Sequence, residues 1–304
     1  MIRSLGHWAY GKAWLLLSAT TLFWAGNSVA SRLIAGEMSP MAVVTLRWLI
    51  VCALLWSTLG GKVSAWRAEL HNARWRIVLM GLFGFTAFNS LFYLAAYHTT
   101  AVNLTLLQSS IPAFVLLGAV VWHGARIGPL QVAGLAITFV SVALIATRGD
   151  LANIVLMSFN RGDLLTLLAC CFYGGFTLAL RDRPKVPGLV FFSALAIVAF
   201  VSSLPLLVVE IALGQAYWPS FKGWMILVYI AFGPSLLSQI FYMRGVELIG
   251  PGRAGIFSNL VPVFGAFLAV LILHEEFHLY HALALALGLG GIWLSEFAAR
   301  RKAA

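Results

Sequence analysis

The chain has 304 residues, of which 61% are hydrophobic and only 10% are charged. A soluble domain carries about 25% charged residues, so this composition excludes a water-soluble globular protein. The formal net charge of +10 could suggest a nucleic-acid-binding protein. The basic residues, however, lie in short breaks between long apolar runs, a spacing typical of anchors at a membrane surface. No nucleic-acid partner is therefore expected.

A helix needs about 20 mainly apolar residues to cross the hydrocarbon layer of a membrane. Ten stretches meet that requirement and are separated by short breaks that carry Gly, Pro or charge: 13–33, 40–59, 75–97, 103–122, 129–147, 163–181, 188–212, 223–246, 254–273 and 280–297. We therefore predict an all-α integral membrane protein with ten transmembrane helices. The three cysteines lie inside apolar runs and indicate neither a disulfide framework nor a metal site.

Two adjacent stretches of the chain recur about 150 residues later. Residues 103–122 return as 253–272, with Pro112 aligned on Pro262. The preceding segment repeats with the pairs Trp75/Trp224, Ile77/Ile226, Phe83/Phe232, Gly84/Gly233, Phe92/Phe241 and Tyr93/Tyr242. Matches in unchanged order indicate one unit written twice. We place the first five-helix repeat at 1–148 and the second at 149–304.

The distribution of Lys and Arg predicts the topology, because cytoplasmic loops carry an excess of both. If the N-terminus is cytoplasmic, 14 of the 20 basic residues lie inside and four lie outside, namely Arg32, Arg148, Arg161 and Lys222. Both termini are therefore predicted to be cytoplasmic. Since each repeat contains an odd number of crossings, the second enters the membrane from the opposite side. Such inverted repeats are typical of secondary transporters that alternate access around a midplane site.

Polar side chains gather beside the two aligned prolines. Pro112 frees the backbone carbonyl of Gln108, and Pro262 frees that of Ser258, both near mid-membrane. Interrupted helices at matching places in two repeats indicate a binding site; the alternative is a pair of simple kinks. We name Pro112 and Pro262 as hinges. The candidate substrate-binding residues are polar or polar-tipped: Trp24, Asn27, Asn89, Tyr93, Gln108, Tyr173, Ser238, Gln239, Tyr242, Ser258 and Asn259.

No carboxylate or histidine occupies the predicted mid-membrane region, where proton relays lie. The expected lumen is neutral, aromatic and rich in amides, which suits a small neutral or zwitterionic solute and disfavours metal-ion or proton pumping. Arg47 is the one charge well inside a segment, and its counterpart in the second repeat is Ala194. We therefore assign Arg47 a structural role, bonding carbonyls or extending outward to the interface.

One motif suggests different chemistry. His274, Glu275, Glu276, Phe277 and His278 read H-E-x-x-H, the zinc-peptidase signature. Zinc needs a third protein ligand, and the downstream candidates His281 and Glu296 are respectively too close in sequence and near the opposite membrane face. A membrane zinc peptidase that uses His274 and His278 is a minor alternative.

The chain resembles the EamA family of the drug/metabolite transporter superfamily over essentially its whole length. The likeness rests on the five-plus-five helices, on Trp24-Ala25-Gly26-Asn27, on Ser39-Pro40 followed by Arg47, on the two central prolines, and on Glu275 followed by Gly291. Ala125 stands in the first copy where the family pattern has the glutamate. The resemblance implies export of amino acids and other metabolites.

Together these features predict a transporter rather than an enzyme. We expect a monomer in a bacterial inner membrane that binds a small-molecule substrate and the lipid bilayer, needs no cofactor, and exports amino acids or related metabolites by alternating access. The alternatives are another solute class (a sugar, a nucleobase or a lipophilic cation) and a channel-like facilitator.

Overall fold

The structure is a computed structural model and describes residues 10–125, 127–150, 160–250, 254–255 and 257–303. Within these ranges all regular secondary structure is helical. The elements are α2 (Ala13–Ile34), α3 (Pro40–Ala65), α4 (Arg67–Asn72), α5 (Arg74–Gly81), η1 (Leu82–Ala87), α6 (Phe88–Ala95), α7 (Ala101–Leu107), η2 (Gln108–Ser110), α8 (Ile111–His123), α9 (Pro129–Ala146), α11 (Arg161–Ala179), η3 (Leu180–Asp182), α12 (Gly188–Ala212), α13 (Phe221–Ile230), η4 (Ala231–Leu237), α14 (Ser238–Ile249), η5 (Phe257–Asn259), α16 (Leu260–Leu273) and α17 (Leu279–Ala303).

Helices occupy all ten of the predicted stretches. Among the described residues, seven segments are long and apolar enough to cross a membrane: Pro40–Ala65, Arg74–Ala95, Ala101–His123, Pro129–Ala146, Arg161–Asp182, Gly188–Ala212 and Phe221–Ile249. Phe257–Leu273 and Leu279–Ser295 are shorter apolar helices. The 22-residue α2 buries polar side chains such as Asn27 and Ser28. Membrane crossing by these last three helices stays a prediction.

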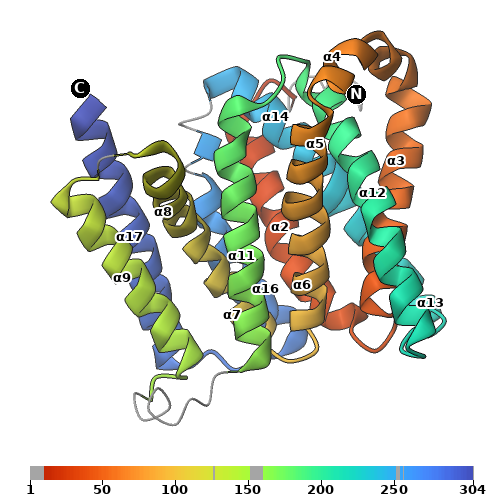
Figure 1. Ribbon diagram of the computed structural model, residues 1–304. Coiled ribbons are helices and arrows are strands. Elements are labelled where there is room, and N and C mark those ends of the chain that lie inside the picture. The colour runs from red at the N-terminus through yellow and green to blue at the C-terminus, as the bar shows by residue number, and fades with distance from the viewer. Residues whose placement is uncertain (1–9, 126, 151–159, 251–253, 256, 304) are drawn as a thin grey trace.

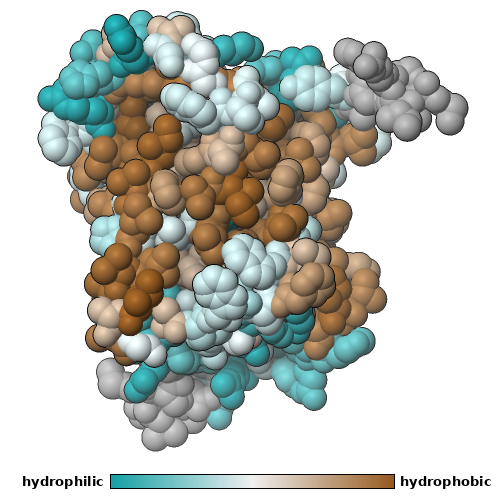
Figure 2. Space-filling view, turned by 90° about the vertical axis from the view of Figure 1, so that its right-hand side faces the viewer, coloured by the Kyte–Doolittle hydropathy of each residue, from teal (hydrophilic) through white to brown (hydrophobic). Residues whose placement is uncertain are grey.

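The outer surface of the bundle is that of a membrane protein. Figure 2 shows a hydrophobic band around the middle of the visible face, with hydrophilic residues gathered toward both ends. Large apolar side chains such as Trp122, Val201 and Phe267 are exposed. Soluble monomers rarely expose contiguous apolar patches of this extent, so the band is the surface that meets the hydrocarbon.

Helices at matching places in the two sequence copies pack against each other. α9 packs along α17, α3 along α12, and α7 against α16. Contacts between helices at different places in the two copies also occur in equivalent pairs. The first helix of the first copy, α2, packs against α14 of the second, and the first helix of the second copy, α11, packs against α6 of the first. In Figure 1, α3 runs upward toward α4 whereas α12 runs downward toward α13. The start of α2 and the end of α17 lie at the same, upper end of the bundle.

The irregular turns recur as well. The π-helix η1 (Leu82–Ala87) has its counterpart in the π-helix η4 (Ala231–Leu237). The 3-10 turns η2 and η5 precede Pro112 and Pro262 in the same way. A π-helical turn holds one extra residue and is frequent at functional sites, so both copies depart from regular α-helix at the same two places.

A close backbone approach joins α9 to α17. A Cβ added to Gly134 would lie 2.6 Å from the carbonyl oxygen of Gly291, and a Cβ on Gly291 would lie 2.6 Å from that of Gly134. Only glycine allows this contact, because a methyl group at either position would overlap the facing backbone. Small residues that bring helix backbones together are typical of packing in membranes.

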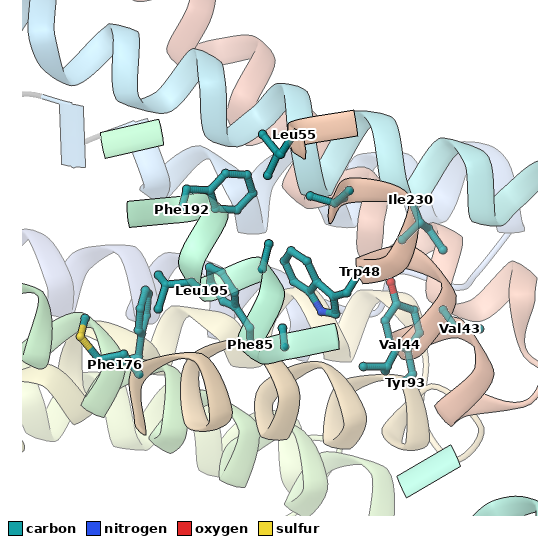
Figure 3. Packing of buried hydrophobic residues seen from close by; sticks show 14 of the residues in the cluster. Val43, Val44, Trp48, Leu55, Phe85, Tyr93, Phe176, Phe192, Leu195 and Ile230 are labelled. Atoms are coloured by element: carbon teal, nitrogen blue, oxygen red, sulfur yellow. The ribbon is translucent and has the colours of Figure 1, made fainter. Parts of the chain in front are cut away.

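An aromatic cluster fills the space between α3, η1 and α12. Trp48 stacks on Phe85 with ring centroids 4.9 Å apart, and Phe192 meets both rings edge-on (Figure 3). Tyr93 lies beside this cluster and is 1% exposed. Trp48, Phe85 and Phe192 form part of the wall of the cavity described next.

Candidate functional site

A cavity of about 650 Å³ lies at the centre of the bundle. Its lining comes from both sequence copies, chiefly from α2, α3, α6, α8, α11, α12, α14 and α16. It extends to Gln131 at the start of α9, to Arg183 after η3 and to Ser295 near the end of α17. The start of α9 and the ends of α11 and α17 lie toward the upper end of the bundle in Figure 1. We call this end of the cavity the mouth.

The structure brings most of the candidate residues to this cavity. Nine of the eleven line it: Trp24, Asn27, Asn89, Gln108, Tyr173, Gln239, Tyr242, Ser258 and Asn259. Pro112 and Pro262 line it as well. Tyr93 and Ser238 lie behind the wall. The Ser238 hydroxyl, at the start of α14, donates to the carbonyl of Pro234 in η4 at 2.5 Å. Contact of these residues with a substrate stays a prediction.

The surroundings of Arg47 differ from those that the sequence predicted. Arg47 lines the cavity, is 4% exposed, and does not reach the interface. Its partners are side-chain oxygens rather than backbone carbonyls: Nε and Nη2 donate to Ser235 Oγ at 3.0 and 2.6 Å, and Nη1 donates to Asn89 Oδ1 at 2.6 Å and to the Tyr93 hydroxyl at 2.9 Å. The cavity is therefore not neutral. A charge deep in an apolar segment was the available signal; the uncharged repeat counterpart, Ala194, obscured it.

Several polar groups on the wall have no bond within the described chain. The side chains of Gln239, Tyr242 and Asn259 line the cavity without a hydrogen bond to any described residue. Gln108 differs, because its Nε2 donates to Ser28 Oγ and to the Leu104 carbonyl, both at 3.2 Å. The first three groups are thus available to a solute, whereas Gln108 is already oriented by its neighbours.

Aromatic rings make up much of the remaining wall. Trp24 and Tyr242 meet with centroids 5.3 Å apart, and Phe88 and Tyr173 with centroids 4.9 Å apart. Cavities that bind small molecules are usually lined by apolar and aromatic side chains with a few placed polar groups. This lining therefore suits a solute with an apolar body and one or two polar ends.

At the end of the bundle opposite the mouth, carboxylates accept hydrogen bonds that join the two copies. Glu275, between α16 and α17, accepts hydrogen bonds from the backbone N–H groups of Ala101 and Val102 at 2.8 and 2.9 Å. It thereby caps the first turn of α7, where unpaired N–H groups favour an anion. Asp163, in the first turn of α11, accepts the Thr99 hydroxyl at 2.5 Å. Both carboxylates belong to the second copy, and all three of these partners belong to the first.

Two more carboxylates lie at this end. Glu210 of α12 accepts the backbone N–H of Met41 at 3.1 Å. Glu37, before α3, accepts the Ser220 hydroxyl at 2.5 Å and pairs with Lys222 at 3.0 Å. The Ser220 hydroxyl and then Lys222 hold the pKa of Glu37 below its ordinary value. We call the four carboxylates Glu37, Asp163, Glu210 and Glu275, with their partners, the seal. None of the four lines the cavity.

The H-E-x-x-H motif lacks the geometry of a peptidase. Residues 274–278 form no helix, so His274 and His278 do not share a helix face as zinc ligation requires. The first glutamate of the motif caps α7, and the second, Glu276, lies 3.2 Å from His278 at the surface. Within the described residues no group of three or more His, Cys, Asp or Glu side chains could hold a metal ion. The zinc-peptidase interpretation is wrong on geometry.

An apolar helical bundle around a central cavity that both sequence copies line fits a multi-pass membrane transporter. Comparisons with known proteins agree. The model of the EamA-like transporter family matches residues 11–147 and again residues 160–297. The chain belongs to the EamA-like transporter family, and the family unit occurs in it twice.

Proteins with similar sequences are also named as transporters. The uncharacterized transporter YyaM of Bacillus subtilis is 23% identical over 262 residues, covering 82% of each chain. An uncharacterized transporter of Archaeoglobus fulgidus is 24% identical over 290 residues, covering 93% of this chain and 97% of the relative. A solved crystal structure aligns over 95% of this chain and 99% of its own with a TM-score of 0.64 at 21% identity, a likeness that concerns the fold alone.

Proposed function

We propose that the protein is a secondary transporter that exports amino acids or related small metabolites across a bacterial inner membrane by alternating access. The observation that supports this most directly is the central cavity, which both copies line and which reaches the exposed Arg183 at the mouth, whereas none of the seal carboxylates lines it. A continuous channel would need an opening at both ends.

We further propose that the two copies form inverted five-helix repeats, 1–148 and 149–304, with ten crossings and with both termini in the cytoplasm. The antiparallel course of α3 and α12 supports the inversion, as does the double match to the family unit. In this orientation the mouth faces the cytoplasm, which corresponds to an inward-open state. Pro112 and Pro262, each preceded by a 3-10 turn, are the proposed bending points.

The test is uptake and exchange in proteoliposomes with radiolabelled amino acids. Gln108→Leu and Asn259→Leu are expected to slow transport while membrane insertion stays intact, because each removes a polar group from the cavity wall. Gln215→Leu, an exposed residue outside the cavity, is the matched control. Accelerated exchange when unlabelled solute is preloaded identifies a carrier, and its absence would identify a channel. Unchanged flux in both cavity variants would refute the assigned site.

A further inference from the structure

We propose that Arg47 is the carboxylate-binding group of the cavity, and that the transported solutes are small carboxylates with an apolar body. This inference rests on the proposed function, because it assigns the substrate class of that transporter. It excludes lipophilic cations, which the sequence alone left open.

The first support is the charge of the cavity wall. Arg47 and Arg183 are the charged residues in the lining, and no described lining residue is acidic. Arg183 is exposed at the mouth, whereas Arg47 is buried deep in the bundle. Each hydrogen-bond partner of Arg47 is neutral. A buried cation without a counterion is strongly unfavourable, so an anion that enters from the mouth gains a partner that the protein does not supply.

The second support is the way the guanidinium is held. A guanidinium carries five N–H groups in a rigid fork. Two of them point to Ser235 Oγ, one to Asn89 Oδ1 and one to the Tyr93 hydroxyl. One N–H of Nη2 has no partner among the described residues. Trp48 lies under the group, with its ring centroid 5.1 Å from Cζ. The fork is therefore fixed in place and retains a free donor.

The acceptors are themselves fixed by a further layer of hydrogen bonds. The Ser235 hydroxyl donates to the Ile230 carbonyl at 2.6 Å, so its oxygen remains free to accept from Arg47. The Asn89 amide donates to the Phe85 carbonyl at 2.5 Å, which turns Oδ1 toward the guanidinium. The Tyr93 hydroxyl donates in the same way to Asn27 Oδ1 at 2.9 Å. Ser235 and Phe85 lie in the two π-helices η4 and η1, so both irregular turns help position the one cation.

The surroundings of Arg47 define the rest of the solute. The Trp48 ring lies 5.1 Å from Arg47 Cζ and stacks on Phe85, and both rings line the cavity. They favour an apolar body attached directly to the carboxylate. Gln239 and Asn259, which have no bond within the described chain, offer amide groups to a second polar substituent such as an amine or hydroxyl. A cationic solute would find no carboxylate on the described wall and would be repelled by Arg47, since like charges interact strongly away from water.

The decisive measurement compares solutes that differ only in their charged end. We choose 3-phenylpropionate, 3-phenylpropanamide and 2-phenylethylammonium, and measure the dissociation constant of each by ligand-dependent thermal shift of the purified protein. The wild type is expected to bind the carboxylate roughly 10- to 100-fold more tightly than the amide, as for a charge-assisted hydrogen bond, and to bind the ammonium most weakly. Arg47→Gln is expected to remove the preference, and Arg47→Lys to retain part of it.

Two matched variants separate this role from a purely structural one. Gly291→Ala disturbs the α9–α17 contact outside the cavity lining, so it should lower the melting temperature and retain the carboxylate preference. Arg67→Gln removes an exposed arginine of α4 and should change neither. The carboxylate preference is the ratio of two dissociation constants measured on the same variant. It therefore does not depend on the fraction of that variant that is folded. If Arg47→Gln fails to fold, the inference is tested by the affinity ratio of the wild type and by that of Arg47→Lys.

Equal affinity of the wild type for carboxylate and amide, or tighter binding of the ammonium, would overturn the inference even if exchange in proteoliposomes is observed. Exchange of no solute at all would overturn the proposed transport function instead, while the affinity ratio would still report on Arg47. The two failures are therefore distinguishable.

Discussion

Replacing Glu275 by glutamine tests whether the seal controls which end of the cavity is open. The carboxylate accepts two backbone N–H groups at the start of α7. A hydrogen bond to a charged group contributes about 1.5–3 kcal/mol and a neutral one about 0.5–1.5 kcal/mol. Glutamine has a single acceptor oxygen, so one N–H loses its partner and the other bond loses its charge. The loss of about 2 kcal/mol should raise the ratio of unsealed to sealed protein roughly 30-fold.

The assay measures the access of an impermeant thiol reagent to the cavity from each face. A reporter is introduced as Ser258→Cys, which lines the cavity, in a background where the native cysteines are replaced by serine: Cys52, Cys170 and Cys171. The reagent is applied to right-side-out and to inside-out vesicles. With Glu275 intact, labelling should come mainly from the mouth face; Glu275→Gln should increase labelling from the opposite face and decrease it from the mouth face.

Glu276→Gln provides the matched control, because this neighbouring carboxylate is exposed and contacts only His278 among the partners described. It should leave the labelling pattern unchanged. If Glu275→Gln also leaves the pattern unchanged from both faces, the seal does not set the resting state and the reasoning is wrong. An equal increase in labelling from both faces would indicate general loosening of the bundle rather than opening at one end.

Two further predictions concern stability and are checked by thermal unfolding of the purified protein. Gly291→Ala should lower stability by about 1–3 kcal/mol, because the added methyl group overlaps the backbone of Gly134. Gly290→Ala on the same helix, where a Cβ meets nothing within 4 Å, should be neutral. Glu37→Gln should lower the melting temperature near neutral pH. The folded pKa of Glu37 is lowered by the Ser220 hydroxyl and by Lys222, so its contribution is present above the unfolded pKa and is lost as the pH falls through the folded one. The difference from wild type should therefore shrink as the pH is lowered below the unfolded value of about 4.3.

The positions of the helices could be predicted from the sequence because long apolar runs leave few alternatives in a membrane. Most of the cavity residues could be predicted for a related reason. Polar side chains in such runs turn inward, and the two prolines mark where the backbone departs from regular helix. Gln108 and Asn259 were both found in this way and both line the cavity.

The surroundings of Arg47 could not be predicted, because they are assembled from distant elements. Its bonding partners come from α6 and η4, and Asn89 turns toward it only because the π-helix η1 supplies a carbonyl. No proline marks η1, whereas Pro234 lies inside η4. Glu275 was equally ambiguous in the sequence: its distance from α7 along the chain says nothing about their contact. Sequence shows which groups are polar, but the fold decides which of them meet.

The pairing of α9 with α17 and of α3 with α12 has a consequence for how the chain can be assembled. Each copy covers the apolar faces of the other, so a fragment that ends after α9 would leave the glycine face of that helix and the inner side of α3 uncovered. Neither half should therefore persist when produced alone. When both fragments are produced together from a gene divided between α9 and α11, they should assemble into a stable bundle, like two subunits inserted in opposite orientations.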